Sequence, residues 1–351
     1  MYNYGLCSTT LSFIVILGRT GYECRTRIET PPEQDVKNRS FNGDTLITVD
    51  NLEKRYGKVH ALRGLSLHVE KASIHGLIGP NGAGKSTTIK ILSTLVRPDS
   101  GLVSLNGIPL KEGARIRDII GVVPEFPGLE KTRSAREELE FHAKLYGLKE
   151  AGARIRILLR DLGLEDVADR PTAGYSTGMK KRTGMALALL HDPEIILLDE
   201  PMSGLDPAIR KQFRDIILKL KEKGKTILVS DHDLFTVEEI CDRVTIIENG
   251  ITVAEDSIKA LNGLSGNACL ELEMREPAAA GQLMEVLSAL NYVTNISKRS
   301  KGLLVRVRKP ESDFPSLIRT ASANAELLGV RPVKQSLEEI FLNITEEMKN
   351  V

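Results

Sequence analysis

The sequence has no excess of charge of either sign, and it has few cysteines. Its 351 residues include 48 basic and 47 acidic side chains, a formal net charge of +1. Nucleic-acid binders usually show a basic excess or a basic stripe, so this balance gives no reason to expect a nucleic-acid partner. The four cysteines are scattered and form no C-x-x-C pair: Cys7, Cys24, Cys241 and Cys269. The pattern suggests neither a metal site nor a disulfide framework, and it favours a reducing compartment.

The sequence also lacks an apolar run long enough to span a membrane. A spanning helix needs about 20 apolar residues, whereas the longest run is Leu11–Leu17, which Ser12 interrupts. No Lys or Arg precedes that run, although a signal peptide would carry one there. We therefore expect residues 1–43 to be a disordered extension, or the product of a start codon placed too early, rather than a targeting peptide.

From Thr45 onward, short apolar segments alternate with helical patterns. Strands are predicted at Thr45–Val49, Leu65–Val69, Ile74–Gly79, Glu194–Glu200 and Lys225–Asp231. Asn106-Gly107 predicts a hairpin turn, and a helix is predicted from Pro207 with Asp206 as its N-cap. Strands alternating with helices predict an α/β fold with a largely parallel sheet covered on both faces. We place this domain at residues 44–262, with an inserted helical subdomain at about 126–180.

After Gly263 the order of elements restarts. An alternating strand at 269–274, a helix around Leu283–Leu290 and a second alternating strand at 303–308 predict a small α+β domain over residues 263–351. Ser336 and Glu339 have the spacing of a capping box, which predicts a last helix. No catalytic cluster is evident in this domain.

A Gly-rich segment follows the predicted strand Ile74–Gly79. It reads GPNGAGKST and fits the phosphate-loop pattern G-x-x-x-x-G-K-[ST], with residues Gly79, Pro80, Asn81, Gly82, Ala83, Gly84, Lys85, Ser86 and Thr87. Glycines let backbone N–H groups surround the phosphates, Lys85 reaches the β- and γ-phosphates, and the Ser86 hydroxyl binds Mg²⁺. Because the loop lies between a predicted strand and a helix, its position favours anion binding.

A second apolar strand, EIILLDE, ends in two acids. Asp199 is expected to hold the Mg²⁺ shell and Glu200 to polarise the attacking water. Together with the phosphate loop, this pairing fits many phosphate-loop proteins, including nucleotide kinases and GTPases. GTPases read guanine with an [NT]-K-x-D segment, and the sequence contains none.

Three further motifs narrow the choice: YSTGMKKR at Tyr175–Arg182, SGLD at Ser203–Asp206 and SDHD at Ser230–Asp233. With the phosphate loop, in this order, they resemble the ATP-binding cassette (ABC) family over about residues 45–256. The resemblance implies a P-loop NTPase core with an antiparallel β subdomain and an inserted helical subdomain. It also implies that ATP and Mg²⁺ are bound and that two copies act as a head-to-tail dimer.

The resemblance assigns roles to further residues. Tyr56 matches the aromatic that stacks on adenine, and Ser176 and Gly178 match the signature loop that contacts the γ-phosphate of the opposite subunit. Asp206 matches the loop that links the two sites, and His232 matches the switch histidine. Glu125 stands where the family usually has Gln. The implied catalytic residues are Lys85, Glu200 and His232, and the implied metal ligands are Ser86, Asp199 and Glu125.

The signature Y-S-T-G-M-K departs from the commonest form, L-S-G-G-Q, and is similar to that of cassettes serving drug, sodium-ion and polysaccharide exporters. We therefore predict the ATPase subunit of an exporter, as a homodimer or a heterodimer with a similar cassette. Its partner would be a separate membrane-spanning permease subunit, and it would lie peripherally on the cytoplasmic face of the membrane. The alternative is a soluble cassette acting in translation or DNA repair. Translation cassettes carry two ATPase units, and repair cassettes insert a long coiled coil, whereas 91 residues separate Lys85 from Ser176.

Overall fold

The computed structural model describes residues 45–258, 260, 269–307 and 310–333. The predictions for the extension 1–43 and for the helix at Ser336 lie outside these residues. The chain divides into two compact units, residues 1–256 and 257–351, and each is described by itself. In the described part of the chain, no helix combines the length and apolar character that crossing a membrane requires.

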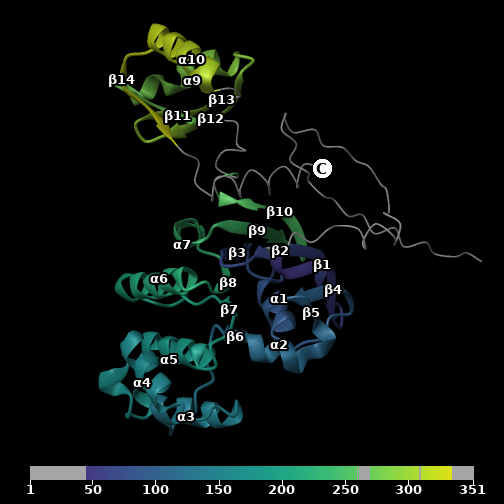
Figure 1. The fold of residues 1–351 in the computed structure, drawn as a ribbon. Coiled ribbons are helices and arrows are strands. Elements are labelled where there is room, and N and C mark those ends of the chain that lie inside the picture. The colour runs from purple at the N-terminus through teal and green to yellow at the C-terminus, as the bar shows by residue number, and fades with distance from the viewer. Residues whose placement is uncertain (1–44, 259, 261–268, 308–309, 334–351) are drawn as a thin grey trace, which may run out of the picture. The chain divides into compact units, whose positions relative to one another are not determined.

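A six-stranded sheet forms the centre of the first unit (Figure 1). Its order is β10 (Ile251–Ser257), β9 (Arg243–Glu248), β3 (Ile74–Ile78), β8 (Thr226–Asp231), β7 (Ile195–Asp199) and β6 (Ile120–Val123). The pairs β3–β9, β3–β8, β7–β8 and β6–β7 are parallel. Every residue of β3, β7 and β8 is buried, as expected of central parallel strands covered on both faces. The predicted parallel α/β core is confirmed.

A second sheet, antiparallel, has the order β2-β1-β4-β5. It consists of β1 (Thr45–Tyr56), β2 (Val59–Glu70), β4 (Ser100–Leu105) and β5 (Ile108–Pro109). Asn106 and Gly107 have φ values of 49° and 70°, which is the left-handed turn that the Asn-Gly pair predicts between β4 and β5. Helix α1 (Lys85–Leu92) packs between the two sheets, and α2 (Gly113–Ile119) leads directly into β6.

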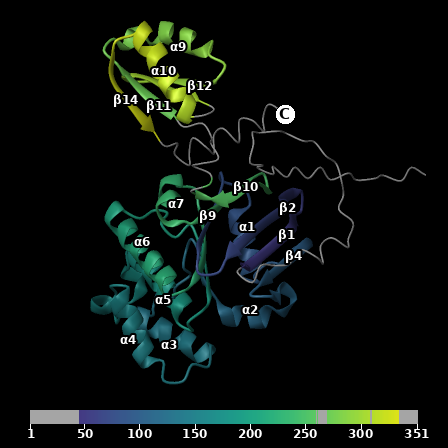
Figure 2. The same cartoon turned by 45° about the horizontal axis from the view of Figure 1, so that its top comes forward.

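The remaining helices of this unit lie on the other side of the six-stranded sheet (Figures 1 and 2). They are α3 (Ala135–Leu145), α4 (Gly152–Asp161), α5 (Thr177–Leu189), α6 (Pro207–Glu222) and α7 (Leu234–Ile240), with short 3-10 turns at Glu165–Val167 and Thr172–Gly174. A third 3-10 turn, Leu110–Glu112, joins β5 to α2. Helices α3, α4 and α5 pack on one another. Asp206 caps α6, as predicted, by accepting the Ile209 N–H at 2.9 Å.

In its described residues, the second unit is a four-stranded antiparallel sheet with two helices. The strand order is β12 (Val293–Arg299), β13 (Gly302–Val307), β11 (Cys269–Met274) and β14 (Leu327–Val333). Helices α9 (Ala280–Ser288) and α10 (Pro310–Asn324) and the 3-10 turn Pro277–Ala279 complete the described part. Leu272, Leu283, Leu303 and Leu317 form the centre of its apolar core. This is an α+β unit with its own core.

Candidate active site

The phosphate-loop segment connects the end of β3 to the start of α1, and two glycines make its path possible. A Cβ added to Gly79 would lie 2.2 Å from the Ile247 carbonyl oxygen. Gly84, the residue before α1, has a φ of 111°, and a Cβ there would lie 2.6 Å from the Leu62 side chain. Side chains at either place would push the loop away from the strands beneath it, so glycine is required by the close approach of the backbone.

Lys85 is buried at the wall of the site. Its ammonium donates hydrogen bonds to the carbonyl oxygens of Gly79 at 2.7 Å and Pro80 at 3.2 Å. Burial lowers the pKa of Lys85, and the nearby carboxylates of Glu200, Asp231 and Asp199 oppose that shift. The Lys85 ammonium is therefore a poorly hydrated cation at the loop. An anionic ligand there would compensate its charge.

Three elements meet at Asp199, the last residue of β7. The Ser86 hydroxyl, at the start of α1, donates to Asp199 Oδ1 at 3.1 Å, and the Ser230 hydroxyl of β8 donates to the same oxygen at 2.7 Å. The structure thus brings together two residues predicted as metal ligands from positions 113 apart in the sequence. A hydroxyl and a carboxylate are the hard oxygen ligands that Mg²⁺ prefers.

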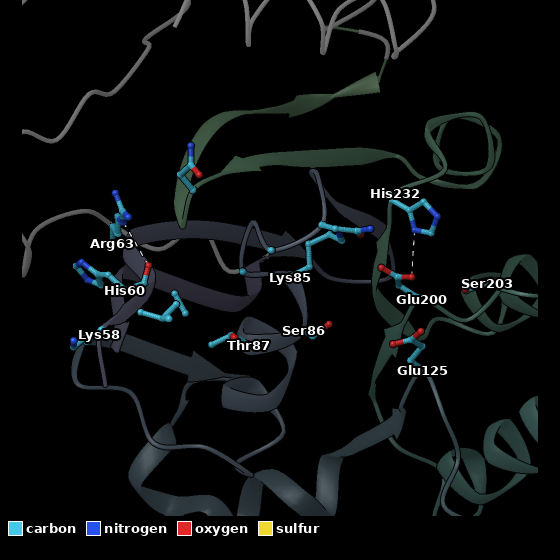
Figure 3. Close-up of a pocket in the computed structure, with 16 residues that line it drawn as sticks. Lys58, His60, Arg63, Lys85, Ser86, Thr87, Glu125, Glu200, Ser203 and His232 are labelled. Carbon is cyan, nitrogen blue, oxygen red and sulfur yellow. Dashed lines mark hydrogen bonds and ion pairs between the residues drawn. The ribbon is translucent and has the colours of Figure 1, made fainter. Parts of the chain in front are cut away.

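Glu200 follows β7 directly. Its backbone N–H donates to the carbonyl oxygen and to the hydroxyl of Ser230, both at 3.1 Å. Its carboxylate lies 3.2 Å from Nδ1 of His232, which follows β8. Figure 3 shows the two side chains facing each other, with Glu125 on the same side of the site. Because β7 and β8 are neighbouring parallel strands, their carboxyl ends hold the two residues side by side.

Lys85, Ser86, Glu200 and His232 line a cavity of about 710 Å³, and Asp199 lies behind its wall, in contact with Ser86. Its wall includes predicted residues from the phosphate loop and from the ends of the strands: Asn81, Gly82, Gly84, Lys85, Ser86, Thr87, Glu125, Glu200 and His232. It also includes residues that the sequence analysis did not single out, notably Lys58, His60, Arg63 and Asn249. Lys58 lies in the turn between β1 and β2, and His60 and Arg63 lie in β2; Lys58 and Arg63 make one part of the wall basic. Their signal in the sequence was their place in the segment Gly57–Arg63, which directly follows Tyr56.

Tyr56 itself does not line this cavity in the described structure. It ends β1, two residues before Lys58, with 43% of its surface exposed and the Lys54 ammonium 5.5 Å from its ring centroid. It lies near the basic part of the wall by its place in the chain, and adenine stacking stays a prediction.

Ser176, Gly178 and Asp206 also lie away from the cavity wall. Ser176 and Asp206 are the exposed N-caps of α5 and α6, and each accepts a backbone N–H of its own helix. A Cβ added to Gly178 would lie 3.1 Å from the Ile209 side chain, so the starts of the two helices pack closely. Ser176 and Asp206 therefore lie on the surface, separate from the lysine and acids above, whereas Gly178 is buried where the two helices pack.

The sequence of the chain is similar to the sequences of known proteins. The chain matches the ABC transporter family over residues 62–203. It is 33% identical to the daunorubicin resistance ATP-binding protein DrrA3 of Streptomyces coeruleorubidus, over 88% of this chain and 98% of that protein. It is 38% identical to the Nod factor export ATP-binding protein I of Burkholderia orbicola, over 84% and 95%. It is 34% identical to the linearmycin resistance ATP-binding protein LnrL of Bacillus subtilis, over 86% and 98%.

Solved structures agree with these sequence relatives. An ATP-binding subunit of an ABC transporter is 35% identical, with a TM-score of 0.59 over 63% of this chain and 94% of its own. The dimeric bacterial ABC transporter cassette MJ0796 is 28% identical, with a TM-score of 0.57 over 61% and 99%. The sequence relatives extend beyond the cassette into the second unit, because they cover 84% or more of the chain. The chain therefore belongs to the ABC transporter family, and it is an ATP-binding, ATP-hydrolysing cassette of the kind that serves exporters.

Proposed function

We propose that the chain binds ATP together with Mg²⁺ and that Glu200 activates the attacking water. The observation that carries this proposal is the meeting of Lys85, the Ser86–Asp199 pair and the Glu200–His232 pair at one cavity. Mg²⁺, held by Ser86 and Asp199, would neutralise charge on the phosphates. Lys85 would stabilise charge on the transferred phosphoryl group. Glu200 would accept a proton from water, and His232 would orient the Glu200 carboxylate.

The position of the signature residues supports action as a head-to-tail dimer. Ser176 is the exposed N-cap of α5, a helix of 13 residues, and Gly178 lies buried in its first turn; neither lines the cavity of its own chain. A helix start offers free N–H groups to anions. A second copy, or a similar cassette, would place this helix start against the γ-phosphate in the first copy. The related cassette MJ0796 is dimeric.

We propose that ATP-driven closure of this dimer works a separate membrane-spanning permease subunit, which would hold the chain at the cytoplasmic face of the membrane. Relatives named for export and drug resistance favour this role over a soluble cassette in translation or repair. Their names concern three different compounds, daunorubicin, Nod factor and linearmycin, although each of these ATP-binding proteins is similar to this chain. The choice of transported molecule therefore belongs to the permease.

A single substitution tests the catalytic and dimer proposals together. Glu200→Gln removes the base but keeps the size of the side chain, so ATP should bind and not be hydrolysed. Size-exclusion chromatography with Mg-ATP should then show a dimer that the parent chain does not accumulate. Glu222→Gln, an exposed glutamate in the last turn of α6, is the control and should behave as the parent.

Two results would contradict the proposals. An ATPase rate of Glu200→Gln equal to that of the parent would exclude Glu200 as the base. A hydrolysis-deficient variant that remains monomeric with saturating Mg-ATP would mean that the dimer does not form from this chain alone.

A further inference from the structure

A buried lysine from the signature helix contacts the backbone of Glu200. Lys181 lies in α5, and only 2% of its surface is exposed. Its ammonium donates a hydrogen bond to the Glu200 carbonyl oxygen at 2.7 Å. Lysine is almost never fully buried unless it is paired. The contact therefore needs an explanation beyond the packing of α5.

The backbone of Glu200 is in a conformation that needs support. Its φ is 44°, in the left-handed region that side chains with a Cβ disfavour. Hydrogen bonds at both ends hold the residue there. Ser230 accepts its N–H, and its carbonyl oxygen accepts from the Lys181 ammonium and from the Ser203 backbone N–H at 3.2 Å. The direction of the Glu200 side chain toward the cavity follows from this backbone conformation. Strained backbone of this kind persists where surrounding groups determine it.

Lys181 also lies in the field of several carboxylates. Burial lowers the pKa of the Lys181 ammonium, and the charges of Glu125, Asp231 and Glu200 oppose the shift, Glu125 most strongly. The same helix packs against the chain that carries Glu125. A Cβ added to Gly184, one turn after Lys181, would lie 2.8 Å from the Pro127 ring. The buried face of α5 therefore meets both the Glu125 segment and the end of β7.

We propose that Lys181 is a positioning residue that fixes the left-handed backbone of Glu200 and supplies a positive charge that offsets Glu125. The inference rests on the proposed function, because it assumes that Glu200 activates water. Helix α5 begins beside Ser176, which would meet the nucleotide of the partner copy. Lys181 thereby links the contact that a cassette makes with its partner's ATP to the base that serves its own ATP.

The experiment compares turnover with nucleotide binding in five variants of the full chain. Lys181→Met removes the hydrogen bond and the charge, and Lys181→Arg keeps a charged donor. Lys181→Gln is tested alone and in combination with Glu125→Gln, which removes both charges. Lys219→Met, which changes an exposed lysine in the last turn of α6, is the control. The measurements are kcat for ATP, the Kd of a fluorescent ATP analogue with and without Mg²⁺, and the melting temperature.

We expect Lys181→Met to lower kcat by roughly 10- to 100-fold, as loss of a charged hydrogen bond predicts. The Kd of the ATP analogue should stay within about threefold, since Lys181 is a positioning residue. Lys181→Arg should recover most of the lost kcat. The kcat of the double variant should exceed that of Lys181→Gln alone, because removing the charge of Glu125 removes the need for a counter-charge at residue 181.

Several results would overturn the inference. A kcat of Lys181→Met within threefold of the parent would exclude the positioning role. A parallel loss of kcat, ATP affinity and melting temperature, without recovery in Lys181→Arg, would assign Lys181 a purely structural role. If the kcat of the double variant is no higher than that of Lys181→Gln, Lys181 does not offset the charge of Glu125. If the parent itself hydrolyses no ATP, the proposed function fails instead.

Discussion

His68 should make the cassette less stable as the pH becomes alkaline. It lies on β2, between Asp50 of β1 and Glu255 of β10, with ring nitrogens 3.3 Å and 3.5 Å from the two carboxylates. Its backbone N–H also donates to Glu255 at 3.1 Å. The hydrogen bond to Asp50, and next that to Glu255, raises the pKa of His68 from 6.5 to about 9. The protonated ring thus connects the antiparallel sheet to the edge of the central sheet.

The size and sign of the effect follow from linkage. A pKa raised from 6.5 to about 9 corresponds to roughly 3 kcal/mol at 1.36 kcal/mol per pKa unit. The His68 side chain is 42% exposed, so solvent screening reduces the expected contribution to about 1 kcal/mol. Because the folded state binds the proton more tightly, the stabilisation is complete below pH 6.5 and is lost as pH rises through 9.

His68→Gln keeps a polar side chain and removes the charge. Urea denaturation followed by circular dichroism should show it less stable than the parent by about 1 kcal/mol at pH 6. The difference should vanish near pH 10, where His68 is neutral in both states. Taking the difference between variant and parent removes the contribution of the second unit. A difference that is the same at both pH values would refute an electrostatic role for the ring.

The remaining predictions concern the nucleotide site. Lys85→Ala should lower kcat by at least 100-fold through loss of charge stabilisation at the transferred phosphoryl group, measured as phosphate release under saturating Mg-ATP; a loss of less than tenfold would contradict that role. Glu125→Gln should lower, by a few-fold, the Mg²⁺ concentration that gives half the maximal ATPase rate, because it removes one carboxylate beside Glu200. An unchanged half-maximal concentration in a Mg²⁺ titration would show that Glu125 has no part in metal binding.

The elements that the sequence predicts best are those whose signals are local. Strand β7 reads as an uninterrupted apolar run and is buried at every residue. The Asp206-Pro207 pair marks the start of α6 because capping and a fixed proline φ both act within one turn. The phosphate loop is recognised from a local motif, although the neighbours that require its glycines, Ile247 and Leu62, belong to distant strands. Strand β7 and the start of α6 are set by short-range chemistry, which a single sequence contains.

The elements that were missed lack such signals. Strand β12 is largely exposed and polar, and β14 contains Gly329 and Pro332, so neither shows a clear alternation. Helix α10 contains Pro315, which argues against a helix when the sequence is read alone. Helix α2 continues into β6 without a turn residue, since Ile119 ends one and Ile120 begins the other. In each case tertiary packing decides the structure over local preference.

The site shows the same limit at the level of single residues. Lys181 stands among charged residues in the sequence, where a lysine normally marks a solvated helix face, yet it is buried against the Glu200 carbonyl. The end of β7 and the turn of α5 that meet there are 19 residues apart in the sequence, beyond the few residues over which capping and periodicity act. The same holds for the left-handed backbone of Glu200, which depends on Ser230 from the neighbouring strand. Motifs therefore identify which residues take part in the chemistry, whereas the fold determines which other residues hold them in the geometry that the chemistry needs.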